Sequence, residues 1–126
     1  MERKHWDKKY NETHKKERAA HRAYLKENDK HYNASALVRR YRQSDLKYAR
    51  GVCTLTAEWI EQNIYTKECI YCGEKDWHKL GCDRIKNYYP HRPNNVVPCC
   101  KRCNELRGLK DFVPYFEMRF METILE

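Results

Sequence analysis

The sequence predicts an α+β fold, with a basic helical arm (residues 1–52) followed by a small domain that a bound metal stabilises and that ends in a C-terminal helix (residues 53–126). Two Cys-x-x-Cys pairs, at 69–72 and 100–103, indicate the metal site, and the residues between them have the composition of two short strands and a loop. Charged residues make up 35% of the 126 positions, so apolar residues are scarce. A core of this size usually needs a metal or disulfides to be stable.

The positive charge lies in the N-terminal part of the chain. Residues 1–50 contain 15 Lys and Arg against 7 Asp and Glu, whereas residues 51–126 contain 11 of each, and the net charge is +8. A basic arm beside a neutral domain is typical of a protein that binds a polyanion, although a solvated charged helix has the same pattern. No apolar run is long enough for a membrane span or a signal peptide, so we expect an intracellular protein.

The arm contains two segments of different character. Residues 1–32 are polar, and we expect either a solvated helix that orders on nucleic acid or a frayed tail. Residues 35–50 predict a helix with Ser35 as its N-cap, a stop at Gly51 and a narrow apolar stripe. The stripe consists of Leu37, Tyr41, Ser44 and Tyr48. The expected nucleic-acid contacts on the opposite surface are Arg39, Arg40 and Arg42.

Two further helices flank the cysteine pairs. Thr56 is the expected N-cap of a short helix from Ala57 to Asn63, and its Trp59 and Ile60 are expected in the core. Asp111 precedes a C-terminal helix in which apolar residues recur every fourth position, so we expect this helix to close the domain by packing. The recurring residues are Phe112, Phe116, Phe120 and Ile124.

The cysteines favour a metal over disulfides because their number is odd and four of them form two Cys-x-x-Cys pairs. Four thiolates are the ligands of a closed, structural zinc site. The assigned ligands are Cys69, Cys72, Cys100 and Cys103. Cys99 neighbours Cys100, but only Cys100 completes the spacing with Cys103. We expect Cys99, Cys53 and Cys82 to be small buried residues.

The 27 residues between the pairs predict a short hairpin. Leu80–Ile85 is a strand that ends in charged residues, Lys86–Asn94 is a polar loop, and Asn95–Pro98 is a returning strand. A helix from Cys100 to Arg107, closed by Gly108, follows.

Strand, loop, strand and helix around four cysteines resemble the HNH (ββα-metal) endonuclease family, in particular the zinc-bearing phage HNH proteins, over residues 66–112. The resemblance implies that Asp83 and Asn104 hold a divalent cation, Mg²⁺ or Mn²⁺, and that Asn95 braces the loop. The chain departs from the family at Arg84, which stands where a His activates water. A guanidinium cannot accept a proton at ordinary pH.

Three interpretations of this departure stay open. His91 in the loop supplies the base, or Arg84 clamps phosphate while a metal-bound hydroxide attacks, or catalysis has been lost. We therefore expect a metal-dependent DNA endonuclease or nickase, as monomer or homodimer, in the cytoplasm of a bacterial host if the chain is phage-encoded. The alternative is a catalytically inactive zinc module that binds nucleic acid or a protein partner. Further expected phosphate contacts are Lys101, Arg102 and Arg107.

Overall fold

The chain folds into helices around a small two-stranded antiparallel sheet, which confirms the predicted α+β class. The computed structural model describes residues 2–125, and the side chains of residues 8–122. In order, its elements are α1 (Glu2–Thr13), α2 (Lys15–Asn28), α3 (Lys30–Lys47), α4 (Ala57–Asn63), the 3₁₀ turn η1 (Trp77–Lys79), β1 (Leu80–Arg84), β2 (Val96–Cys100), α5 (Lys101–Arg107) and α6 (Phe112–Leu125).

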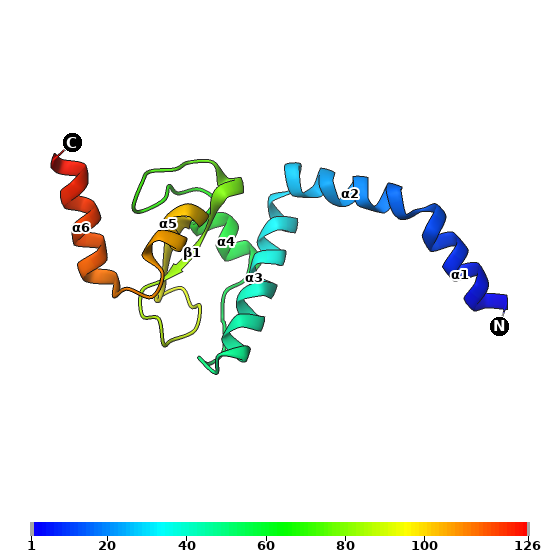
Figure 1. The fold of residues 1–126 in the computed structure, drawn as a ribbon, viewed down its shortest axis with the longest axis horizontal. Coiled ribbons are helices and arrows are strands. Elements are labelled where there is room, and N and C mark those ends of the chain that lie inside the picture. Colours follow the sequence, from blue (N-terminus) through cyan, green and yellow to red (C-terminus); the bar gives the residue numbers. More distant parts are fainter. Residues whose placement is uncertain (1, 126) are drawn as a thin grey trace.

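Helices α1 and α2 extend away from the packed part of the molecule, as Figure 1 shows. Helix α2 buries none of its residues, as expected for a segment without an apolar stripe. The two helices meet at a bend, where the Arg18 Nη2 atom donates a hydrogen bond to the Asn11 carbonyl at 2.8 Å. Residues 2–28, which the sequence predicts as either a solvated helix or a frayed tail, are therefore helical apart from the turn at His14, and most of their described side chains, from residue 8 on, are exposed.

Helix α3 connects this extended part to the core. It begins at Lys30 because the Asp29 side chain caps it, accepting a hydrogen bond from the Tyr32 N–H at 2.9 Å. The predicted cap at Ser35 is wrong, since that residue lies inside the helix. Tyr48 was also placed wrongly on the apolar stripe, because it is exposed beyond the end of the helix. The buried residues of α3 are Ala34, Val38 and Asp45.

The sheet and the two short helices agree with the expected order of elements. Thr56 caps α4 by accepting a hydrogen bond from the Trp59 N–H at 3.2 Å, and Ile60 is fully buried. In the sheet, the register runs from Leu80 opposite Cys100 to Arg84 opposite Val96. Strand β2 includes a proline, which a two-stranded sheet tolerates because both strands are edges. Helix α5 continues directly from β2.

Helix α6 lies at the opposite end of the molecule from α1 (Figure 1), and its first half packs against the core. Tyr115 is buried and Phe116 is half-buried against the core. Phe120 is 56% exposed, so the expectation that the whole apolar stripe closes the domain is wrong at this position. The side chain of Ile124 lies outside the described residues. Among the residues described, no helix has both the length and the apolar character required to cross a bilayer.

Candidate metal centre and adjoining cleft

Four cysteines from three segments gather into one cluster that could hold a metal ion such as zinc. Their sulfur atoms all lie within 4.8 Å of one another, and the cluster consists of Cys69, Cys72, Cys100 and Cys103. A tetrahedral zinc with Zn–S bonds of about 2.3 Å needs sulfur atoms about 3.8 Å apart. The Sγ atoms of Cys72 and Cys100 are 3.7 Å apart. The residues therefore fit the ion that the spacing predicted.

Local backbone geometry brings the four thiols together. Gly73 adopts φ 78°, a conformation that favours glycine, and its N–H donates to the Cys69 carbonyl at 2.9 Å to close the first turn. The N–H of Ile70 donates to the Pro98 carbonyl at 3.0 Å, which fixes this turn against β2. On the other side, Cys100 caps α5 and accepts from the Cys103 N–H.

Cys99 lies beside the cluster rather than in it. It is buried, and its thiol donates a hydrogen bond to the Cys100 carbonyl at 3.2 Å. The choice of Cys100 over Cys99 as the fourth member therefore agrees with the geometry. Cys53 and Cys82 are buried away from the cluster, as expected.

A cleft of about 560 Å³ lies between α3, β1 and α5, and four of the five predicted catalytic residues line it. These four residues are Asp83, Arg84, His91 and Asn104. Four further Lys and Arg side chains and a second histidine also line the cleft: Arg40, Arg50, Lys79, Lys101 and His78. The chain thus brings a carboxylate, two amides, two imidazoles and several cations to one cavity. Asn95, the fifth predicted residue, does not line it.

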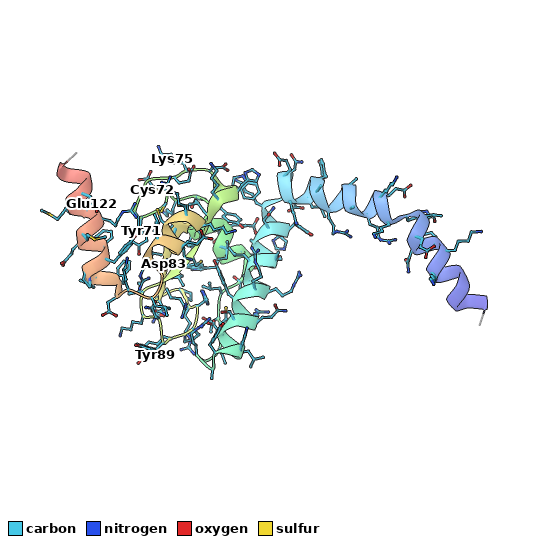
Figure 2. All side chains as sticks on the ribbon, in the orientation of Figure 1. Tyr71, Cys72, Lys75, Asp83, Tyr89 and Glu122 are labelled. Carbon is cyan, nitrogen blue, oxygen red and sulfur yellow. The ribbon has the colours of Figure 1, made fainter. Side chains whose placement is uncertain are left out.

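Asp83 is 4% exposed, and both of its carboxylate oxygens already accept a hydrogen bond. The Arg107 Nη1 atom donates to Oδ1 at 2.8 Å, and the Tyr71 hydroxyl donates to Oδ2 at 2.5 Å. Burial, followed by this hydrogen bond, raises the pKa of Tyr71. Tyr71 and Asp83 lie together in the middle of the packed body in Figure 2. Because Tyr71 belongs to the turn between Cys69 and Cys72, one side chain joins the cysteine cluster to the cleft.

Arg107 is an internal residue, 1% exposed, so its predicted contact with DNA phosphate is wrong. Besides Asp83, its guanidinium donates to backbone carbonyls, including those of Ile85 at 3.2 Å and Lys110 at 3.0 Å, and to Asn87 Oδ1 at 3.2 Å. It also donates to the carbonyl of Arg84. One buried cation therefore holds β1, the start of the loop and the end of α5 together. The other expected phosphate contacts, Arg39, Arg40, Arg42, Lys101 and Arg102, are exposed.

Asn95 fastens the loop that follows β1. Its Oδ1 atom accepts from the Lys86 N–H at 2.9 Å, and its Nδ2 atom donates to the Pro90 carbonyl at 3.0 Å. At 6% exposure, it acts from the interior. Arg84, at the edge of the same loop, donates to the carbonyl of Asn87 and is half-buried.

His91 is buried against α3 and forms a close pair with Asp45. Its Nδ1 atom lies 3.1 Å and 3.0 Å from the two Asp45 carboxylate oxygens, and its backbone N–H donates to Oδ2 at 2.9 Å. The Arg50 Nε atom donates to Oδ1 at 2.9 Å. The imidazole also stacks on Tyr41, with ring centroids 4.0 Å apart. A carboxylate therefore fixes both the backbone and the ring of His91.

Asp45 was not among the predicted site residues, although the sequence contained a signal for it. It follows Ala34, Val38 and Tyr41 on the face of α3 that turns toward the core. A carboxylate on such a face requires a partner, because an unpaired buried charge is costly. The sequence could not identify the partner, which comes from 46 positions further along the chain.

Comparison with known proteins gives no family for the chain: no protein-family model matches it, and no curated protein does so.

Proposed function

We propose that the chain is a metal-dependent DNA endonuclease or nickase of the HNH, or ββα-metal, type. The observation that carries the proposal is the single cleft lined by Asp83, Asn104, Arg84 and His91. Hydrolysis of a phosphodiester requires groups that hold the phosphate, groups that stabilise its developing charge, and a base for water. The side chains of the cleft offer each of these chemistries.

The cysteine cluster holds a structural zinc in this proposal. Four thiolates close the coordination sphere, so this ion keeps no open position for substrate. Its role is to fasten the turn of residues 69–73 to β2 and α5, the elements that border the cleft. Through Tyr71, the same turn also holds Asp83.

A second cation, Mg²⁺ or Mn²⁺, would be held by Asp83 and Asn104. Each Asp83 oxygen accepts one hydrogen bond and keeps one further acceptor position, and the exposed Asn104 adds an amide oxygen. Carboxylate and amide oxygens suit these hard cations, whose remaining positions are filled by water and phosphate. The bound ion would stabilise negative charge on the scissile phosphate and on the leaving oxygen.

The cations of the cleft would bind the DNA backbone around the scissile bond. Arg84 offers planar donors suited to phosphate, and Arg40 and Lys101 are exposed at the rim. Arg84 cannot accept a proton, so its role in this proposal is to clamp phosphate.

The extended helices α1 and α2 would lengthen the DNA contact. Lys15, Arg18 and Arg22 lie at helical spacing on α2, and together with Lys8 of α1 they border one shallow groove at the bend. All four are exposed, so their charges are free to meet phosphates. Residues 15–22 of α2 would span about 10 Å, at about 1.5 Å per residue, and Lys8 of α1 would add a contact beyond the bend.

The second candidate function is DNA binding without cleavage, and one observation favours it. Arg107 forms an ion pair with Asp83, which is the only carboxylate among the described residues that line the cleft. This pairing reduces the negative charge available to a cation. A binding module would keep the zinc, the basic helices and the phosphate-binding arginines, and would lack the second ion.

A plasmid-nicking assay with Mg²⁺ or Mn²⁺ tests the proposal. The informative variant is Asn104→Ala, because Asn104 is exposed and we expect its replacement to leave the fold intact. Removal of a side chain that only hydrogen-bonds to a metal ligand lowers metal affinity or activity by about 10–100-fold. We therefore expect Asn104→Ala to lower the nicking rate by that factor or more. Glu105→Ala, the next residue on α5 and also exposed, is the matched control. DNA binding in a gel-shift assay without any nicking would favour the second candidate.

A further inference from the structure

We propose that His91 is the base that activates water, and that Asp45 on α3 positions it, in place of the residue at position 84. This inference rests on the proposed endonuclease function. It assigns the proton-accepting group to a different segment from the one that the family resemblance indicates, and it gives α3 a role in catalysis as well as in packing.

The contacts of His91 leave one ring nitrogen for chemistry. Nδ1 faces the two oxygens of Asp45, which can only accept, so Nδ1 carries the hydrogen and Nε2 carries the lone pair. No buried side-chain nitrogen or oxygen among the described residues lacks a hydrogen-bond partner. Among the described residues, the hydrogen bonds of the imidazole involve Nδ1 alone, so the Nε2 atom is not fully buried. His91 lines the cleft, and in this proposal Nε2 opens onto it.

The surroundings keep the imidazole neutral. Burial lowers the pKa of His91, and this effect outweighs the carboxylate of Asp45, which raises it. The positive charges of Arg84 and Arg50 lower this pKa further, and the phenol ring of Tyr41 stacks on one side of the imidazole. Asp45 itself stays ionised: burial alone would raise its pKa, but hydrogen bonds from His91 and Arg50 lower it. A neutral imidazole beside an ionised carboxylate is the state that a base requires.

In the proposed reaction, protons pass from the attacking water to His91, from solvent to the leaving oxygen, and from His91 to solvent. Water attacks the phosphorus atom as His91 Nε2 takes one of its protons, and an O–P bond forms. The bond from phosphorus to the leaving sugar oxygen breaks, and that oxygen takes a proton from solvent. The imidazolium, stabilised by Asp45, then returns its proton to solvent. No oxidant or further reactant is needed.

A purely structural role for Asp45 and His91 makes different predictions. If Asp45 and His91 only anchored the loop to α3, a glutamine at position 91 would serve as well, because its amide can also donate to the carboxylate. The loop is also held by Asn95, whose hydrogen bonds are independent of His91. Loss of activity in a folded His91→Gln protein would therefore result from the loss of the proton acceptor, and not from the loss of the contact between the loop and α3.

The test is the pH dependence of plasmid nicking by the unaltered chain, His91→Gln and Asp45→Asn, with melting temperature and zinc content measured for each. We expect His91→Gln to lower kcat/KM at pH 7.5 by about 10²–10⁴-fold. We expect Asp45→Asn to lower the plateau and to move the acidic limb of the profile to lower pH, because the carboxylate raises the pKa of His91. His31→Gln, an exposed histidine paired with Glu61 outside the cleft, is the matched control.

Nicking by His91→Gln within about threefold of the unaltered chain overturns this inference and leaves the endonuclease proposal standing. No nicking by the unaltered chain overturns both. If His91→Gln does not fold, ¹⁵N spectra of the unaltered chain replace it as the test. A hydrogen on Nδ1 and a pKa below 6.5 support the assignment, whereas a hydrogen on Nε2 at neutral pH rules it out.

Discussion

Replacement of Arg107 by methionine removes a cation that is 1% exposed and that joins three parts of the cleft wall. The change leaves the Asp83 carboxylate without its ion-pair partner, and the backbone carbonyls of Ile85 and Lys110 without their donor. Breaking a buried ion pair from one side typically costs about 3–5 kcal/mol, because an uncompensated charge stays in the interior. A total stability of about 5–15 kcal/mol would be greatly reduced.

Urea denaturation with zinc present, followed by circular dichroism, measures this loss. We expect Arg107→Met to lower the free energy of unfolding by about 3–5 kcal/mol. Arg102→Met is the matched control, because Arg102 lies on the same helix and is exposed, and we expect it to change stability by about 0.5 kcal/mol or less. A loss below about 1 kcal/mol for Arg107→Met would show that Asp83 does not depend on Arg107, and would refute the reasoning.

Three further predictions concern the arm, the His91 pair and the zinc. Lys15→Gln combined with Arg22→Gln should reduce the slope of log DNA affinity against log salt by about 1.8, measured by fluorescence anisotropy. Lys9→Gln with Lys16→Gln, outside the groove, should leave the slope unchanged, and equal effects of the two pairs would contradict DNA binding along the groove. The pKa of His91 is lower in the folded chain than in the unfolded chain. The contribution of neutral His91 to the free energy of unfolding is therefore complete above pH 6.5, and it is lost as the pH falls through the pKa of the folded state. The unaltered chain should therefore lose stability relative to His91→Gln between pH 7.5 and pH 5, and parallel urea midpoints would contradict this. Chelation of zinc should lower the urea midpoint and zinc addition should restore it, whereas an unchanged midpoint would argue against a structural ion.

Much of the fold follows from local sequence signals. The Thr56 cap, the cysteine spacing and Gly108 each act within a few residues, so the helices and strands around them were predicted with small errors at their ends. The start of α3 was missed because two polar residues, Asp29 and Ser35, are both good caps, and the choice between them depends on the core that the helix meets. The exposed end of α6 was missed because periodicity identifies an apolar face but not whether anything covers it.

The site was predictable where it depends on spacing, and not where it depends on tertiary contacts. The cysteine cluster follows from two short motifs. The burial of Arg107 does not, because a basic residue on a helix usually lies in solvent, and only the folded chain brings Asp83 to it. The same holds for Asp45 and His91, whose pairing depends on the loop folding back onto α3.

The most direct measurement of the central proposal is anomalous scattering from crystals grown with zinc and soaked in Mn²⁺. We predict one peak at the zinc edge among Cys69, Cys72, Cys100 and Cys103, and a separate manganese peak in the cleft, between Asp83 and Asn104. A zinc peak with no manganese in the cleft would contradict the metal-dependent nuclease. The absence of zinc from the cysteines would contradict the account of the fold as well.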